Sequence, residues 1–220
     1  FFFGVGVGLG WGWGLGGGSG HPSAARPWVS VIVERYRRAW MQQFITRQPR
    51  IFDASIIDNL RQATAFFASA SMIAIGGGGA LIGNPGPLLG LTHDLTQTTT
   101  TLELQLRVLP VIWFLSNGLL KFIWAHRLFG YCAILMAAVP NDPADPQAPF
   151  RAAQAAEVNI HAARNFNRGM RSVYFALGAL GAMMGPWMLI ASTLAVAGVI
   201  IRREFASQSR AIMLQKGPSE

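Results

Sequence analysis

Polar side chains close to long apolar stretches are the residues of this sequence that could do chemistry. Asp58 and Arg61 lie three positions apart, and Asn117 and Lys121 lie four apart, so each pair would share one face of a helix. Polar groups inside a membrane are costly and often line ion or substrate paths. We therefore expect a candidate intramembrane polar network, formed by Asp58, Arg61, Asn117 and Lys121. A structural ion pair with a snorkelling lysine is the simpler interpretation.

The histidines and the single cysteine are weaker candidates for chemistry than these polar residues. His126 and Arg127 follow an apolar run and His161 lies in a polar stripe, so all three are candidates at the cytoplasmic face. We expect a polar or solvated role for them, because haem and metal sites need clustered ligands. The single cysteine, Cys132, excludes an intramolecular disulfide, and its apolar surroundings predict packing. No nucleophile or nucleotide motif is present, so we expect no catalytic residue, metal or cofactor.

The composition is typical of a membrane protein. The chain is 51% hydrophobic and 13% charged, whereas soluble domains average about 25% charged residues. The net charge is +8, and its basic residues flank the apolar runs. This arrangement predicts contact with anionic lipid headgroups on the cytoplasmic side. No nucleic-acid-binding motif is present, so nucleic acid is not expected as a partner.

Uncharged runs predict the membrane spans. At ~1.5 Å per residue, the run at 63–83 can cross the ~30 Å hydrocarbon core, and its many small residues favour packing against other helices. A second span is expected at 108–125, with the helix continuing beyond it through 128–139. A third is expected at 172–201, where Gly185–Pro186 lies in the middle. We expect one long kinked helix there, with a re-entrant hairpin as the alternative.

The first residues alternate Gly with bulky side chains, as in "GVGVGLGWGWG". A lone strand cannot satisfy its backbone in a bilayer, and so much Gly makes a poor helix. We nevertheless expect a first span at 1–18. Our hypothesis is that residues 1–20 mark a real first membrane helix whose true sequence is uncertain.

Two amphipathic helices are expected at 27–50 and 150–170. In the first, aromatic residues on one side and arginines on the other suggest a helix at the membrane surface. The expected contacts to lipid headgroups are Arg35, Arg37, Arg38 and Trp40. An ordinary amphipathic helix packed on a cytoplasmic bundle is the alternative.

The charge bias orients this arrangement. With four spans, both termini face the periplasm and most basic residues lie in the cytoplasm. The basic C-terminal tail is the exception, and a hairpin at Pro186 would move it inside.

Several long strings resemble one bacterial membrane-protein family, catalogued as domain of unknown function 599. They include "RQPRIFDASIIDNLRQATAFFASASMIAIGG", "KFIWAHRLFGYCAILMAAVPND" and "AAEVNIHAARNFNRGMRSVYFALGALG". The resemblance covers residues 21–212 and implies an inner-membrane protein with about four helices. It implies no catalytic residue, cofactor or substrate.

We therefore expect residues 1–220 to form a single all-α, polytopic membrane domain. The expected function is that of a non-catalytic accessory or scaffold subunit. It would pack with other membrane subunits, or with itself, in a larger assembly such as a respiratory or photosynthetic complex. The alternatives are a small transporter or channel using the Asn117 and Lys121 face, and a membrane enzyme of unknown reaction.

Overall fold

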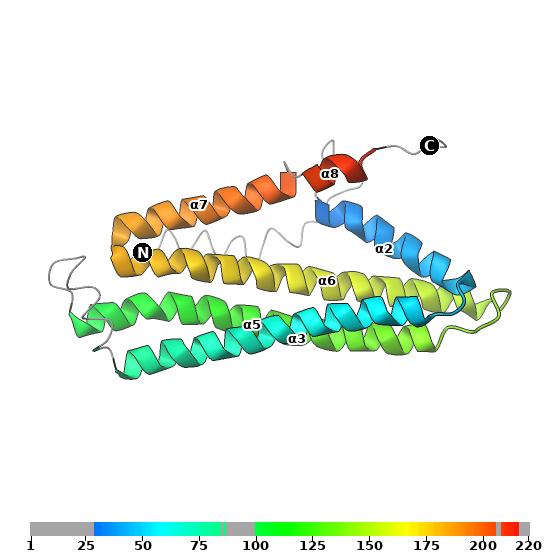
Figure 1. Cartoon of the computed structure of the whole chain (residues 1–220), viewed down its shortest axis with the longest axis horizontal. Helices are drawn as coiled ribbons and strands as arrows, with labels where there is room; N and C mark the ends of the chain where they lie inside the picture. The colour runs from blue at the N-terminus through cyan, green and yellow to red at the C-terminus, as the bar shows by residue number, and fades with distance from the viewer. Residues whose placement is uncertain (1–28, 85, 87–99, 206–207, 216–220) are drawn as a thin grey trace. The chain divides into compact units, whose positions relative to one another are not determined.

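The structure is a computed structural model that describes residues 29–84, 86, 100–205 and 208–215. Every regular element in these ranges is helical, which confirms the expected all-α class (Figure 1). In chain order the elements are α2 (Val29–Thr46), α3 (Ile51–Gly83), α5 (Thr101–Ala137), α6 (Gln147–Ala179), the 3-10 turn η2 (Leu180–Met184), α7 (Pro186–Phe205) and α8 (Gln208–Met213). The expected span at 1–18 lies outside the described residues.

Local capping explains where the long helices begin. Thr100 and Glu103 form a reciprocal capping box before α5, with both N–H to side-chain oxygen distances at 3.3 Å. Before α6, the Asp145 carboxylate accepts the backbone N–H of Gln147 at 2.8 Å. The helix expected at 27–50 ends earlier, at Thr46, because Pro49 interrupts the chain before α3 begins.

Within the described ranges two helices, α3 and α5, are long and apolar enough to cross a membrane, so the expected four spans stay a prediction. Only 6% of the most apolar stretch of α3 is buried within the chain, against 28% for α5. The core helix of a soluble protein would be mostly buried, so this exposure favours association with a membrane. α5 is continuous to Ala137, as the expected extension through 128–139 requires.

The described residues divide into two compact units. Unit 1 comprises 66–123 and 166–199, and unit 2 comprises 19–65, 124–165 and 200–220, each within the described ranges. Unit 1 is dominated by uncharged stretches at 66–84, 108–120 and 172–199. Unit 2 contains all the ion pairs described below. α3, α5 and α6 contribute residues to both units.

Aromatic rings and glycine hold unit 1 together. The rings of Phe67, Phe122 and Phe166 come from α3, α5 and α6, and their centroids lie 5.5–5.6 Å apart. Gly169 makes room for this cluster, because a Cβ atom there would lie 2.6 Å from the Phe122 ring. The three helices therefore approach one another closely at this level.

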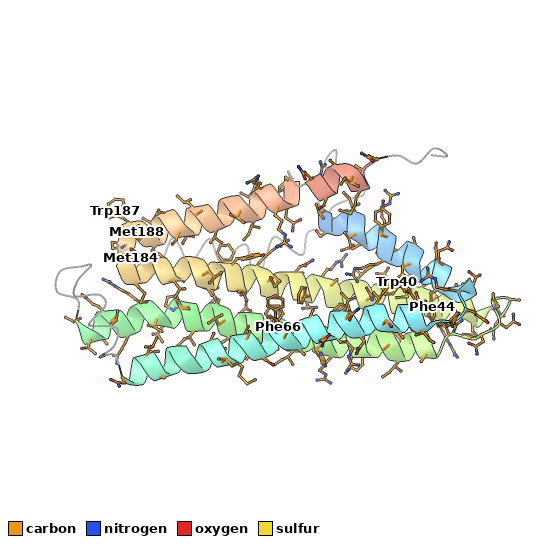
Figure 2. The ribbon with its side chains drawn as sticks, in the orientation of Figure 1. Trp40, Phe44, Phe66, Met184, Trp187 and Met188 are labelled. Atoms are coloured by element: carbon orange, nitrogen blue, oxygen red, sulfur yellow. The ribbon has the colours of Figure 1, made fainter. Side chains whose placement is uncertain are left out.

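The chain reverses direction at Gly185, so the expectation of one kinked helix over 172–201 is wrong. Gly185 adopts a φ of 112°, which favours glycine, and Pro186 begins α7, where its missing N–H costs nothing. The Ser192 hydroxyl then donates to the carbonyl of Gly178 at 2.6 Å, which packs α7 back along α6. Figure 2 shows Trp187 close to this turn, where it is 81% exposed.

Unit 2 has a core of its own. Met41 and Phe44 of α2 and Met136 of α5 are buried against a row of small α6 side chains, namely Ala148, Ala152, Ala155 and Ala156. α8 lies beside α2, where the Tyr36 hydroxyl donates to the carbonyl of Met213 at 3.3 Å.

Candidate functional site

The predicted four-residue network does not lie in one unit. Asp58 and Arg61 belong to unit 2, whereas Asn117 and Lys121 belong to unit 1. The Asn117 amide donates to the Ser172 hydroxyl at 2.7 Å, which links α5 to α6. The network as a whole therefore stays a prediction, and each pair is described in its own unit.

The two cytoplasmic-face histidines have separate partners. His126 Nδ1 lies 3.3 Å from the Arg61 carbonyl and 3.2 Å from the Thr64 hydroxyl. His161 Nδ1 contacts the Glu157 carbonyl of its own helix at 2.8 Å. Within the described part of the chain, no three His, Cys, Asp or Glu side chains gather as a metal site would require.

Arg127, the third residue expected at that face, is exposed and contacts neighbours on its own helix. Its guanidinium donates to the Tyr131 hydroxyl at 2.9 Å and lies 5.7 Å from the centre of the Trp124 ring. These contacts hold Arg127 on the surface of α5.

A buried polar chain links α2, α6 and α5 in unit 2. The Arg37 guanidinium donates to the side-chain oxygen of Asn159, whose amide donates to the Cys132 sulfur at 3.6 Å. Asn159 and Cys132 are fully buried. Burial lowers the pKa of Arg37, since removal from water disfavours the charged form. Arg37 is therefore a half-buried residue that links α2 to the buried Asn159 of α6.

Two ion pairs also join α2 to α6. Arg38 donates to the Glu157 carboxylate at 2.7 Å, and Arg164 holds both oxygens of Glu34 at 2.7 and 2.8 Å. The residue numbers rise along α2 as they fall along α6, so these helix segments are antiparallel. The hydrogen bond from Arg38 lowers the pKa of Glu157.

The Asp53 carboxylate accepts hydrogen bonds from one residue of α2 and from one residue just after α2. It accepts from the Trp40 indole at 2.6 Å and from Arg47 at 2.5 Å. Arg37, Arg38 and Trp40 all use polar groups within the protein, and the headgroup contacts expected of this set stay a prediction. Arg35, the fourth residue predicted to contact headgroups, is exposed, and no hydrogen bond of its side chain to another described residue is observed. The sequence showed the charges of α2 but not the acceptors that face them.

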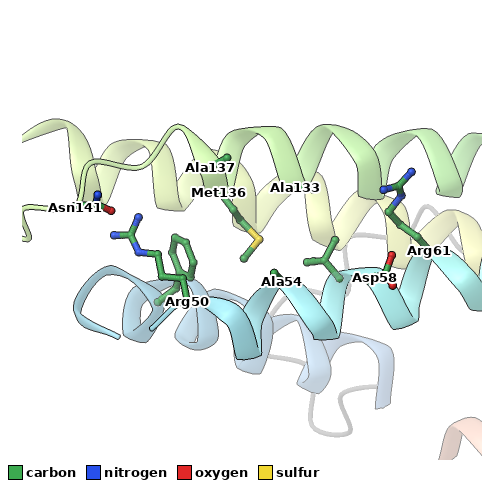
Figure 3. A pocket seen from close by; sticks show the side chains of 10 residues that line it. Arg50, Ala54, Asp58, Arg61, Ala133, Met136, Ala137 and Asn141 are labelled. Atoms are coloured by element: carbon green, nitrogen blue, oxygen red, sulfur yellow. The ribbon is translucent and has the colours of Figure 1, made fainter. Parts of the chain in front are cut away.

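Unit 2 also contains a pocket of about 380 Å³ between α3, α5 and the end of α2. Figure 3 shows Arg50 and Asn141 toward one end and Asp58 and Arg61 toward the other, with Met136 between them. The volume is in the range of small-ligand sites. Two of the four sequence-predicted network residues, Asp58 and Arg61, therefore line one cavity.

Arg50 is the pocket residue that sequence reasoning missed. Its guanidinium donates to the carbonyls of Val139 and Pro140, both at 2.8 Å, and lies 4.5 Å above the Phe44 ring. These bonds tie the start of α3 to the chain just beyond α5. An arginine directly after Pro49 was the only local signal.

Comparison with known families gives one match. The family model described as "Protein of unknown function, DUF599" matches residues 5–209, so the match begins upstream of residue 21, where the resemblance was expected to begin. No curated protein and no solved structure matches the chain. Because the family model covers most of its length, the chain belongs to the DUF599 family of proteins of unknown function.

Proposed function

We propose that the chain is a non-catalytic, multi-pass protein of the bacterial inner membrane, and that it packs as an accessory subunit against another membrane protein or a second copy. The observation that carries this proposal is the uncovered face of α3. Among the described residues, a Cβ atom at Gly76, Gly77 or Gly79 would meet nothing within 4 Å, whereas one at Gly78 would meet Ile112 at 2.9 Å. Small residues favour close helix–helix contact in membranes, so this face fits a protein neighbour better than lipid alone.

The hairpin supports a topology in which both arms of α6–α7 cross the membrane. Arg107, near the start of α5, lies 3.5 Å from the carbonyl of Met183 at the turn, so the turn reaches the outer end of α5. Exposed Trp187 suits a membrane interface there. The uncharged part of α7 is residues 186–201, which at ~1.5 Å each cover about 24 Å, and Arg202 and Arg203 in the last turn can snorkel to the headgroups.

This topology places the C-terminus in the cytoplasm. Residues Tyr36 and Met213 are in contact, and two segments in contact cannot lie on opposite sides of a membrane. With the expected first span included, the chain crosses five times instead of four. Apart from Arg107, and from Lys121 near the cytoplasmic end of the expected span at 108–125, every Lys and Arg then lies on the cytoplasmic side. This satisfies the positive-inside rule better than the four-span arrangement does.

The accessory role is better supported than a transporter using the Asn117 face. The Asn117 amide is already bonded to Ser172, and Phe114 and Phe175 stack close by with ring centroids 5.8 Å apart. A transport path needs polar groups that a substrate can reach.

Extraction from native membranes in a mild detergent tests the accessory role. We expect the wild-type chain to migrate as part of a larger assembly, and Gly77→Leu to release it while the chain stays folded, because the side chain points into open space. Met72→Leu, which conserves volume at an exposed position, is the matched control. A wild-type chain that leaves native membranes as a stable lone monomer would contradict the proposal.

A further inference from the structure

The pocket of unit 2 has an excess of positive charge. Its ionisable lining residues are Arg50, Asp58 and Arg61, so one carboxylate faces two guanidinium groups. The Arg61 guanidinium forms no ion pair or hydrogen bond with the described residues, and its Nε is buried without a partner. The Nε of Arg50 is likewise buried and unpaired, although its terminal nitrogens hold carbonyl oxygens. An unpaired buried donor is expensive, so the pocket favours an anion.

The middle of the pocket is apolar. Phe44, Ile57 and Met136 are among its apolar lining residues, and Figure 3 shows Met136 between the two charged ends. A small inorganic anion would leave this surface in contact with water. A ligand that carries both a phosphate and an apolar portion would cover it.

The position of Arg61 in the sequence indicates the source of such a ligand. Arg61 is the last charged residue before the uncharged run of α3 that starts at Ala63. On the proposed topology this is the level of the cytoplasmic headgroups, where basic pockets between helices bind anionic lipids. Asp58, exposed at the same end, can accept a hydrogen bond from a headgroup hydroxyl.

We propose that this pocket binds the phosphodiester of an anionic phospholipid, with Arg61 as the main phosphate contact and the acyl glycerol against the apolar middle. The proposal rests on the membrane location proposed above but not on the accessory role. It adds a headgroup site in a cavity between α3 and α5 to the arginines of α2, of which Arg37 and Arg38 are engaged within the protein.

Lipid binding to the full-length, delipidated chain in detergent tests this assignment, read by native mass spectrometry. The probes are phosphatidylglycerol, phosphatidylcholine with the same acyl chains, and glycerol 3-phosphate, which has a phosphate but no acyl chain. We expect phosphatidylglycerol to bind at least about tenfold more tightly than the other two. Arg61→Gln should weaken its binding about tenfold, as expected for loss of a charge-assisted hydrogen bond.

Two further variants separate specific from general effects. Arg127→Gln removes an exposed arginine outside the pocket and should change binding less than about threefold. Ala54→Leu narrows the pocket without changing its charge, and it should weaken lipid binding while the far-UV circular dichroism stays that of the wild type. This variant keeps the test decisive if Arg61→Gln fails to fold.

Three results would overturn the proposal. The first is an equal loss of phosphatidylglycerol affinity in Arg61→Gln and Arg127→Gln, and the second is equal affinity of the wild-type chain for phosphatidylglycerol and phosphatidylcholine. The third is binding of glycerol 3-phosphate as tight as that of phosphatidylglycerol. The last result would assign the pocket to a soluble phosphate ester. Carbonate extraction of native membranes reports the membrane location separately, so failure of that location and failure of the pocket are distinguishable.

Discussion

Gly181 is the position at which the α6–α7 hairpin should be most sensitive to a single methyl group. A Cβ atom there would lie 2.3 Å from the Ser192 hydroxyl and 2.7 Å from the carbonyl oxygen of Met188. The hydroxyl belongs to a side chain that can rotate, at the cost of its bond to Gly178. The carbonyl is backbone, so α7 itself must move to admit the methyl group of Gly181→Ala.

The expected cost follows from two opposing terms. Inserting a methyl group into close packing costs ~1–3 kcal/mol. Replacing Gly with Ala in helical structure returns up to ~1 kcal/mol. The net destabilisation of Gly181→Ala should therefore be about 1–2 kcal/mol, which for a chain of this length lowers the Tm by roughly 2–8 °C.

Thermal unfolding of the purified chain in one detergent measures this difference. Gly198→Ala is the matched control, because it lies on the facing arm, α7, and a Cβ there meets nothing within 4 Å. We expect the Tm of Gly198→Ala to stay level or rise. If Gly181→Ala is as stable as Gly198→Ala, α7 does not pack along α6 as described, and the hairpin topology loses its support.

Three further predictions concern the contacts in unit 2. Glu34→Gln should cost about 1–2 kcal/mol of unfolding free energy, because Glu34 is 14% exposed and accepts two hydrogen bonds from Arg164. Glu157→Gln, at an exposed ion pair, should cost less than about 1 kcal/mol. Equal losses of unfolding free energy in chemical denaturation would refute this ranking. The folded-state pKa of Glu157 is below its usual value of 4.5, so its contribution to the stability of the folded chain is present above that pH and is lost as the pH falls through the folded pKa. The difference in unfolding free energy between wild type and Glu157→Gln should therefore close in acid. A difference that stays constant with pH would contradict the pairing of Glu157 with Arg38. Asn159→Ala should cost about 2–3 kcal/mol, because it removes a fully buried amide and leaves the half-buried Arg37 guanidinium without that acceptor. A loss no larger than that of Glu157→Gln in the same denaturation assay would argue against this bond.

The helical class and the apolar helices followed from local signals in the sequence. A Thr-x-x-Glu box begins α5, and an uncharged run marks the apolar part of α3. The extension of α5 to Ala137 was also predictable, since 128–139 is apolar and contains neither Pro nor a cluster of turn residues before its end. Each of these features depends on residues close together in the chain.

The reversal at Gly185 could not be decided by such signals. A Gly–Pro pair within an apolar run is compatible with a kink inside one helix and with a turn between two. What distinguishes them is the contact of Ser192 with Gly178, together with the space left by Gly181. These are contacts between two segments, and the hydropathy pattern along one segment does not reveal them.

The contacts of the arginines of α2 were likewise not decided by the local sequence. Their observed partners bear on where a ligand can bind. A basic helix face is compatible with lipid headgroups and with acidic residues of another helix, and the sequence offered a usable clue. When α2 is placed antiparallel to 150–170, Glu34 meets Arg164 and Arg38 meets Glu157, so both pairs bring opposite charges together. Each of these arginines therefore already holds a carboxylate of the neighbouring helix. Arg61 is different, because it lines a cavity and no carboxylate of the described residues pairs with it. The same charge bias that first indicated lipid contact therefore points to the pocket between α3 and α5, where binding requires a specific headgroup instead of a general negative surface.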